Sequence, residues 1–528
     1  MIRVPGSDHR RLVGSAQPSK GVSAVRETEL KLALQEGFEL PVLEPAATGV
    51  AAVRERPPAD LRATYFDTAD FRLARNGITL RHRTGEDERS GWTLKLPLDG
   101  ADGHGAAVRE EHFFQGRRTA PPPEAVDLVT AYVRGSSLGP VAKIQTKRRS
   151  WALTDANGSE LAELAADEVS VLDKRRKVVL FRELELEARA LDRDGLDRIA
   201  GELTKAGAAL GDPTPKLVRV LGEQAAAPPD LVPSRVPRPA DPAGEAVRAA
   251  FVAGTLRMVA TDPGTRLGQV EPLHQMRVAL RRLRSDIRTF APLIEEGWAK
   301  DITPELRWLG SALGAVRDRD VLLERLRESA AGLEGDLAPL FESLEASRRN
   351  EHGKLLEALS SKRYGRLVDS LTEAALAPPL TEAADRPCAE VLPPLVQKAW
   401  KKLVKKVKTT SATAPAEDLH EVRIHVKRVR YAAEAVGPSL TGKKAKRARR
   451  FSDKAAALQD VLGANQDTVV ARHTIAEAAG LRPQDAAFGA AATSLFERQQ
   501  ELAIEQRYRY PKSWAKLNRP KRTKWMRL

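Results

Sequence analysis

The sequence predicts a multidomain α+β protein in which an antiparallel β domain precedes an all-α domain. Residues from about 25 to 221 form short runs of alternating polar and apolar residues broken by turn residues, the period of a β-strand. From 246 to about 506 the apolar residues are spaced by three and four, the period of an α-helix. Between them, residues 225–243 hold six prolines and show neither period. The chain therefore divides into two domains of different class.

Composition limits the class of protein. With 528 residues, the chain is too long for one ordinary core. It is 42% hydrophobic and 30% charged, so it is too apolar for general disorder. The single cysteine, Cys388, excludes an internal disulfide and any zinc site that needs two or more cysteines. The sequence shows neither a run of about 18 apolar residues nor an apolar N-terminal run of signal-peptide length. We therefore expect a cytoplasmic protein without a transmembrane segment.

The net charge of +15 indicates an anionic partner but does not identify it. Residues 507–528 contain nine Lys or Arg and no acid, which leaves only +6 for the other 506 residues. Aromatic residues interleave with these cations, at Tyr508, Tyr510, Trp514 and Trp525. Such a segment could stack on bases, lie at a membrane interface or dock onto the helical domain. We favour docking.

The expected boundaries follow from these shifts in pattern. They are a disordered leader (1–24), a β domain (25–222), a proline-rich linker (223–244), a helical domain (245–506) with two repeats (about 245–375 and 390–506), and a basic aromatic tail (507–528).

Charged residues alternate along several predicted strands. Glu27, Glu29 and Lys31 project from one face if their run is a strand. The same parity recurs in Arg81 and Arg83, in Arg109 and Glu111, and in Glu183, Glu185 and Glu187. An inward face carrying both signs of charge is costly unless the charges meet ligands. Carboxylates suit Mg²⁺ or Mn²⁺, and Lys and Arg suit the oxygens of a polyanion. The alternative is cross-strand ion pairing on a solvated face.

The ordered set of these motifs resembles the CYTH domain of the triphosphate tunnel metalloenzymes. The motifs are Glu27-x-Glu29-x-Lys31, Tyr65-Phe-Asp-Thr68, Leu80-Arg81-His-Arg83, Lys95, Arg109-x-Glu111, Arg148 and Glu183-x-Glu185-x-Glu187. The resemblance spans residues 25–222. It implies an eight-stranded antiparallel tunnel in which basic residues hold a triphosphate and acidic residues hold one or two divalent metal ions, Mg²⁺ or Mn²⁺.

The resemblance also implies roles for individual residues. The expected catalytic residues are Glu27, Glu29 and Lys31. The expected metal ligands are Glu27, Glu29, Asp167, Glu185 and Glu187, with Glu183 as a further candidate and with Glu163 and Glu168 competing for the place given to Asp167. The expected triphosphate ligands are Lys31, Arg81, Arg83, Lys95, Arg109, Arg148, Lys216 and Arg219.

The implied reaction is metal-dependent hydrolysis of a terminal phosphoanhydride, with no covalent nucleophile. Thiamine triphosphatases and class IV adenylyl cyclases share the motifs, which therefore do not encode an organic substituent. The attached helical half favours inorganic triphosphate, cleaved to diphosphate and phosphate. The alternatives are an enzyme acting on thiamine triphosphate or ATP, and a non-catalytic polyphosphate-binding scaffold, against which the retained acidic set argues.

The helical half repeats itself. Residues 273–284 match 419–430, and 313–318 match 462–467, in the same order. In the first copy His274, Arg277, Arg281, Arg284 and Arg288 form a stripe along a helix, and in the second His420, Arg423, Lys427 and Arg430 take the same positions. Like charges at this spacing repel, so a duplicated stripe indicates an anion-binding face. One alternative is a solvated basic face. Another is a zinc site at the two histidines, but no acidic partner recurs beside both of them to support it.

These repeats resemble the CHAD domain, which is known to follow CYTH domains and is associated with inorganic polyphosphate. The resemblance spans about 245–505 and implies polyphosphate contacts at His274, Arg277, Arg281, Arg284, His420, Arg423, Lys427 and Arg430. Arg282, Arg428 and Tyr431 are weaker candidates because of their angular offset or uncharged head. The expected partners are inorganic triphosphate and polyphosphate, with polyphosphate granules as a candidate location. The sequence shows no base-reading module, so we expect no nucleic-acid partner, and it predicts no protein partner.

Overall fold

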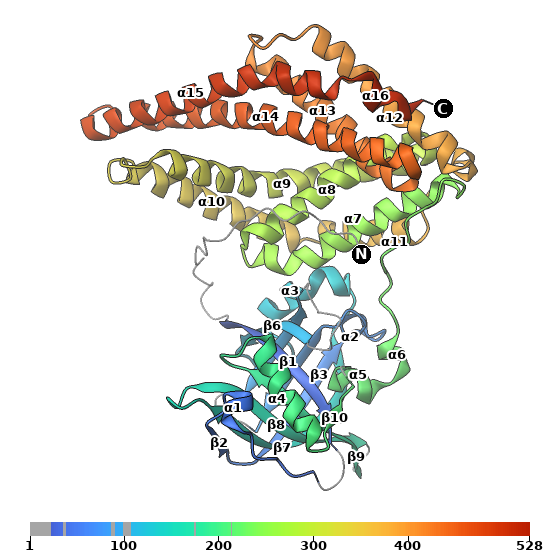
Figure 1. The fold of residues 1–528 in the computed structure, drawn as a ribbon, viewed down its shortest axis with the longest axis vertical. Helices are drawn as coiled ribbons and strands as arrows, with labels where there is room; N and C mark the ends of the chain where they lie inside the picture. The colour runs from blue at the N-terminus through green and yellow to red at the C-terminus, as the bar shows by residue number, and fades with distance from the viewer. Residues whose placement is uncertain are drawn as a thin grey trace. The chain divides into compact units, whose positions relative to one another are not determined.

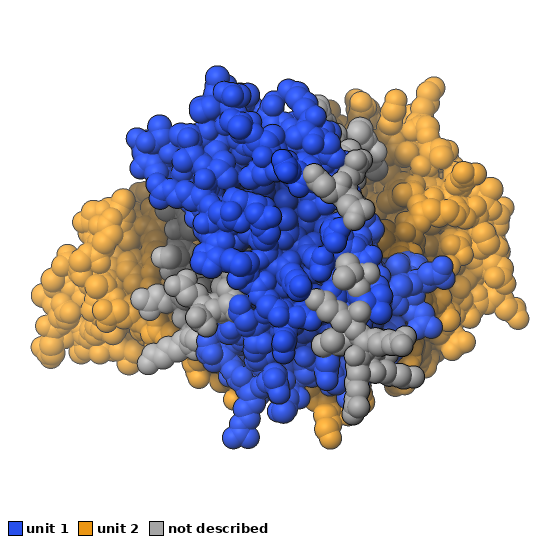
Figure 2. Space-filling model, turned by 90° about the horizontal axis from the view of Figure 1, so that it is seen from below, with its two compact units in different colours: residues 1–229 blue, residues 230–528 orange. Residues whose placement is uncertain are grey.

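The chain forms two compact units, residues 1–229 and 230–528, which we call the barrel unit and the helical unit (Figure 2). The computed structural model describes the backbone of residues 23–34, 38–85, 90–98, 107–173, 176–212 and 214–527 (Figure 1). The expected leader lies outside these residues except for Ser23 and Ala24. Of Glu27, only the backbone is described.

The barrel unit is built on a closed antiparallel ring of strands. In order around the ring these are β1 (Ser23–Ala33), β6 (Ala107–Phe114), β5 (Gly91–Pro97), β4 (Thr79–Thr84), β3 (Ala59–Asp67), β7 (Gly139–Thr154), β8 (Glu160–Asp173) and β9 (Arg176–Ala188). Strand β9 pairs back with β1, which closes the ring. Two short strands pair outside it, β2 (Ala52–Glu55) with β7 and β10 (Ala209–Leu210) with β1. The predicted eight-stranded antiparallel barrel is therefore confirmed.

The apolar side chains of the ring face outward, under helices. Leu30, Leu184 and Leu186 belong to one buried cluster with Leu196 and Ile199 of α4 (Arg193–Lys205). Because successive side chains of a strand point to opposite faces, this packing turns the charged parity of β1 and β9 into the barrel. The remaining helices of the unit are α1 (Pro45–Thr48), α2 (Arg72–Arg75), α3 (Pro123–Val133), α5 (Lys216–Leu221) and α6 (Glu223–Ala226).

The helical unit confirms the predicted all-α class. Its helices are α7 (Ala243–Arg266), α8 (Val270–Thr289), α9 (Glu296–Ser329), α10 (Ala338–Leu359), α11 (Lys362–Leu376), α12 (Cys388–Lys408), α13 (Ala416–Val436), α14 (Gly442–Gly480), α15 (Ala486–Leu517) and α16 (Pro520–Thr523) (Figure 1). Within the described residues, none of the helices is both long and apolar enough to cross a bilayer.

The sequence repeat is also a structural repeat. The first repeated motif lies on α8 and α13, and the second on α9 and α14. Gly314 of α9 lies under Arg277, so that a Cβ there would be 3.7 Å from the guanidinium Nε. Gly463 of α14 lies under Arg423 in the same way, at 3.6 Å. Each copy thus seats its arginine against a glycine of the next long helix.

The basic aromatic tail packs onto the helical unit. Helix α15 continues past residue 507 to Leu517, so the tail is not a separate segment. The ring of Trp514 stacks on that of Trp400 in α12, with centroids 5.5 Å apart. Trp525 is 1% exposed, and its ring lies 6.1 Å from that of Phe451 in α14. Of the three readings of the tail, this arrangement corresponds to docking.

Candidate functional site

The interior of the barrel is a cavity lined by charged side chains of both signs. The space it leaves open is about 60 Å³, because these side chains fill most of the bore. The lining residues are Glu29, Lys31, Tyr65, Thr79, Arg81, Arg83, Lys95, Arg109, Glu111, Arg148, Glu185, Glu187, Pro215, Lys216 and Leu217.

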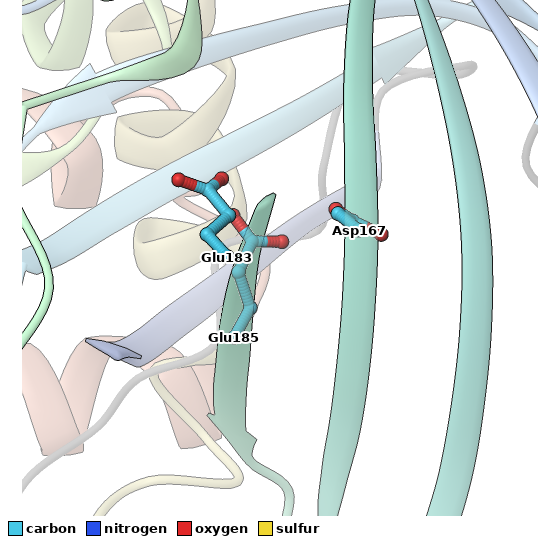
Figure 3. Close-up of side chains that lie close together, drawn as sticks. All are labelled: Asp167, Glu183 and Glu185. Carbon is cyan, nitrogen blue, oxygen red and sulfur yellow. The ribbon is translucent and has the colours of Figure 1, made fainter. Parts of the chain in front are cut away.

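Three carboxylates converge at one side of this interior. Oxygens of Asp167, Glu183 and Glu185 lie within 4.8 Å of one another (Figure 3). The strand register produces this meeting, because Asp167 on β8 is paired with Glu183 on β9 and Glu185 lies two residues further along the same face. Asp167 is only 1% exposed. Converging buried carboxylates are the ligands that Mg²⁺ and Mn²⁺ prefer.

Two buried cations lie against this acidic cluster. Arg148 donates to both oxygens of Asp167, at 2.8 and 2.7 Å, and to Glu185 at 2.8 Å. The ammonium of Lys216 contacts Asp167 and lies 3.2 Å from Glu183 and 3.1 Å from Glu185. Burial favours the neutral form of a carboxyl, and nearby cations favour the charged form. The cluster is therefore held together by its own internal counter-ions.

The balance of burial and charge differs among the three carboxyls. Burial acts to raise the pKa of Asp167, but Lys216 and Arg148 outweigh it, so the pKa is lowered. The same two cations overcome burial at Glu185 and hold its pKa well below the usual range. At Glu183, burial prevails over the attraction of Lys216 and the pKa is raised. The pKa of Lys216 is raised because Asp167 and Glu185 outweigh its burial.

Other lining residues form a cationic wall with acids interspersed. Arg81 donates to the hydroxyl of Tyr65 at 3.3 Å, and Lys95 forms an ion pair with Glu111. Arg109 lies 3.6 Å from Oε1 of Glu29. That oxygen is buried and accepts no hydrogen bond from the described residues. A buried carboxylate oxygen without a donor is costly, so this atom is suited to a ligand.

The candidate acids differ in their strand face and in their partners. Asp167 is in the cluster, whereas Glu163 accepts from Arg56 at 2.9 Å and from Arg189 at 2.6 Å. Glu168 points away from the bore and pairs with Arg182 at 3.2 Å. Glu187 lines the cavity but accepts from Arg189 at 2.6 Å. The structure thus groups Glu183, rather than Glu187, with Asp167 and Glu185.

The remaining predicted residues of the barrel are placed as follows. Lys31 lies 3.9 Å from both Glu29 and Glu185. Arg219 donates to Glu183 at 2.8 Å from helix α5, next to Lys216. The backbone of Glu27 pairs with Arg109, and its side chain lies outside the described residues.

Sequence reasoning assigned no role to five of the lining residues, among them Tyr65 and Glu111. A signal existed for Glu111, which shares parity with Arg109 and is paired in register with Lys95. Asp67, which belongs to the same motif as Tyr65, has a structural role. Asp67 accepts from the backbone amides of Leu73 and Ala74, at 2.9 Å each, and so organises the turn into α2.

In the helical unit, the two basic stripes meet around Tyr431. The guanidinium of Arg281 lies 5.5 Å from the ring centre of Tyr431, and that of Arg430 lies 5.6 Å from it. Burial and the charges of Arg423, Arg281 and Arg277 lower the pKa of Lys427 to about 7. We call this cluster the basic face. It comprises His274, Arg277, Arg281, Arg423, Lys427 and Arg430.

The other candidates of the stripes have different neighbours. Arg284 lies by Arg307, whose charge adds to burial in lowering the pKa of Arg284. Arg282 donates to Glu434 at 2.7 Å. The ring of His420 lies 3.3 Å from the amide oxygen of Gln466. Arg317, in the second repeated motif, is a neighbour of His274, whose pKa it lowers in addition to the effect of burial.

Comparison with protein-family models gives two matches. The CYTH domain model matches residues 25–220, and the CHAD domain model matches residues 249–476. Two uncharacterized proteins from two strains of Mycobacterium tuberculosis are each 34% identical over 472 residues, which is 83% of this chain and 86% of theirs.

Solved structures are also similar. PptA from Streptomyces chartreusis is 22% identical with a TM-score of 0.44, over 52% of this chain and 99% of its own. The CHAD domain from the plant Ricinus communis is 28% identical with a TM-score of 0.44, over 54% of this chain and 96% of its own. A putative adenylyl cyclase from Hippeastrum, described as having a dominant triphosphatase activity, is 16% identical with a TM-score of 0.23, over 36% and 93%.

Proposed function

The chain belongs to the family of proteins in which a CYTH domain precedes a CHAD domain, and we propose that its barrel hydrolyses inorganic triphosphate while its helical unit binds polyphosphate. The observation that carries the proposal is the buried acidic cluster of Asp167, Glu183 and Glu185 beside a cationic wall inside a closed barrel. A phosphate chain needs cations for its oxygens, and a divalent metal ion needs carboxylates.

The residues of the site fit a divalent metal ion. The acidic cluster supplies converging oxygens, and Oε1 of Glu29 is buried without a hydrogen bond among the described residues. The three carboxylates of the acidic cluster would hold Mg²⁺ or Mn²⁺, and Glu29 is a further candidate ligand. When bound, such an ion neutralises phosphate oxygens and makes a water molecule more acidic.

The chain's own residues bind and orient the substrate. Arg81, Arg83, Lys95 and Arg109 line the cavity from three neighbouring strands and would bind non-bridging oxygens of the triphosphate. They also stabilise the negative charge that develops on the departing diphosphate. Because the reaction is attack by water, the chain need supply no covalent nucleophile.

The cavity favours an inorganic substrate. Among the described lining residues, the one aromatic ring is that of Tyr65, and its hydroxyl accepts from Arg81. Recognition of a base or a thiazolium ring typically uses stacking on aromatic side chains and an apolar wall. A lining dominated by charge instead matches a ligand that is all phosphate.

The basic face supports the second half of the proposal. Its cations come from both copies of the repeat, and burial together with the charges of neighbouring cations lowers the pKa values of Lys427 and Arg281. A bound polyanion would relieve the repulsion between these cations. Polyphosphate binding would also concentrate the protein at polyphosphate granules in the cytoplasm.

The test is phosphate release from four substrates. Tripolyphosphate, thiamine triphosphate, ATP and long-chain polyphosphate are compared in Mg²⁺, in Mn²⁺ and in EDTA, for the wild type and for Glu27→Ala/Glu29→Ala. We expect metal-dependent release from tripolyphosphate that the double substitution abolishes. Preference for an organic substrate would overturn the substrate assignment, and no turnover with polyphosphate still bound would leave a scaffold.

A further inference from the structure

The duplication of the helical unit has produced two cavities of about 290 Å³ each. The first lies among α7, α8 and α13, and the second among α8, α12 and α13. Residues 146 apart take equivalent places, as Leu273 and Leu419 do in the repeated motif. With the residue of the first cavity given first and that of the second cavity given second, the equivalent lining pairs are Ala279 and His425, Arg282 and Arg428, Asp286 and Ala432, Tyr431 and Ser285, and Glu434 and Arg288.

The first cavity is lined by acids as well as cations. Arg282 donates to Glu434 at 2.7 Å, and Arg235 donates to Asp241 at 2.6 Å. Asp286 adds an acid to the lining, although burial raises its pKa to about 8. Linker residues 234–237 also line this cavity. Two of the three cations that line this cavity, Arg235 and Arg282, are therefore paired with acids of this chain, and Arg257 is the third.

The described lining of the second cavity lacks these acids, and we call it the basic cavity. In the second cavity, Arg288 stands where the first cavity has Glu434, and Ala432 stands where it has Asp286. Arg428 therefore faces a second cation instead of an acid. All the charged or titratable residues in the described lining are basic, namely Arg288, Lys398, Lys402, His425 and Arg428. Segment 234–237 does not contribute to its lining.

Neighbouring acids do not offset the positive charge of the basic cavity. Glu421 is one turn from His425 on α13 and acts on it, but Lys406 holds Glu421 at 2.5 Å and Asp418 at 2.8 Å. Nε of Arg428 is buried and makes no hydrogen bond within the described part of the chain. After burial, the charge of Arg428 lowers the pKa values of both His425 and Arg288. The basic cavity thus has donors and positive charge that its own residues do not satisfy.

The basic cavity is separate from the basic face. On α13, His425 precedes Lys427 by two residues, which places them about 160° apart around the helix axis. The apolar part of the cavity wall comes from Leu395, Ala399, Pro292 and Ala291. We propose that the basic cavity is a second anion site of the helical unit, which binds a phosphate group of a small molecule such as diphosphate or of a polyphosphate terminus.

The imidazole of His425 allows the site to be observed directly in the full chain. Histidine side chains are labelled with ¹³C, and the His425 signal is assigned with His425→Gln. Diphosphate and long-chain polyphosphate are then titrated separately. We expect a saturable shift of the His425 signal toward its protonated position, since a bound anion favours the charged imidazole. A shift with diphosphate identifies free small phosphates as the source, and a shift with long chains alone identifies a chain terminus.

Substitutions in the cavity connect the signal to the site. Arg428→Ala should weaken the titration at His425 at least about tenfold, because a charge-assisted hydrogen bond is lost. Arg288→Glu gives the basic cavity the acid that the first cavity has at the equivalent position, and it should abolish the shift. Because Arg288 is exposed, this substitution should have little effect on folding. Arg257→Ala, in the first cavity, is the matched control and should leave the titration unchanged. A His425 signal that moves with neither anion, or moves equally in Arg288→Glu, would overturn the proposal.

Discussion

Asp167 and Glu168 are adjacent carboxylates with opposite environments. Asp167 lies inside the barrel between Arg148 and Lys216, and burial together with these cations sets its pKa. Glu168 points to the other face of β8, where it pairs with Arg182. One step along a strand therefore separates a group suited to a metal ion from a surface ion pair.

Lys216 stabilises the acidic cluster from within. Replacing it, as Lys216→Met, leaves three buried carboxylates with less compensation, which we expect to cost about 3–5 kcal/mol of barrel stability in EDTA. Added Mg²⁺ should recover much of that loss, because a metal ion supplies the missing charge. Hydrogen exchange of peptides from β8 and β9 measures both conditions. The exposed Lys205→Met should change protection little, and a loss in Lys216→Met that is equal in EDTA and Mg²⁺ would contradict this account.

The lowered pKa of Lys427 predicts how polyphosphate binding depends on pH. The pKa of about 7 reflects burial and the charges of Arg423, Arg281 and Arg277, opposed by Asp467. Below pH 7 the amine of Lys427 is already charged. Above pH 7 the amine must take up a proton when polyphosphate binds. Affinity should therefore fall by up to about tenfold per pH unit as the pH rises from 7 to 9.

The measurement is the dissociation constant for polyphosphate at several pH values, in the wild type and in Lys427→Met. The pKa of His274 is lowered from 6.5, so in the unliganded protein its imidazole is uncharged throughout this window. The substitution should flatten the dependence. An unchanged slope in Lys427→Met would show that another group takes up the proton.

The sequence predicted which residues share a face but not which strands meet. Parity alone placed Glu29 with Lys31, because both follow from a period of two within one strand. Parity could not separate Glu163 from Asp167, nor Glu183 from Glu187, because the members of each pair project from the same face and the choice depends on the register between β8 and β9. Glu168 has the opposite parity, but the sequence did not show which face of β8 is turned inward. Register is set by closure of the whole ring, which no local pattern reports.

Among the elements, the segment after residue 506 departed most from its expected boundary. Its run of basic residues suggested a separate tail, yet α15 continues through Pro511, Trp514 stacks on Trp400 of α12, and Trp525 contacts Phe451 of α14. Composition concealed this because long basic side chains can lie on the solvent face of a helix whose opposite face is packed, as Tyr510 is here.

Trp525 therefore contributes to the stability of the helical unit. Its side chain is 1% exposed and contacts the ring of Phe451 edge-on. Trp525→Ala should destabilise the unit by about 3–5 kcal/mol, as removal of a large buried aromatic side chain usually does. Tyr508→Ala, at a residue 75% exposed, should change stability by less than about 0.5 kcal/mol. Urea unfolding measures both, and equal stability of the two variants would mean that the tail is not docked.

At the scale of the whole molecule, both units bring cations to a potential anion site by different means. The barrel does so through strand alternation and closure, and the helical unit through duplication of a helix pair. The fold class was readable from the sequence because each period persists over a whole domain, and because the proline-rich segment divides them. The divergence of the two duplicated cavities was not readable, since it depends on Arg288 and Glu434 reaching across to the other copy.

The most direct test of the central claim compares Asp167→Asn with Glu168→Gln in phosphate release from tripolyphosphate. The two residues are neighbours, and both substitutions remove one carboxylate, but only Asp167 belongs to the acidic cluster. We predict that Asp167→Asn lowers turnover at least about 100-fold in saturating Mg²⁺ or Mn²⁺, while Glu168→Gln stays within about twofold of the wild type. Full activity in Asp167→Asn, or turnover in EDTA equal to that in Mg²⁺, would contradict the assignment of the barrel as a metal-dependent triphosphatase.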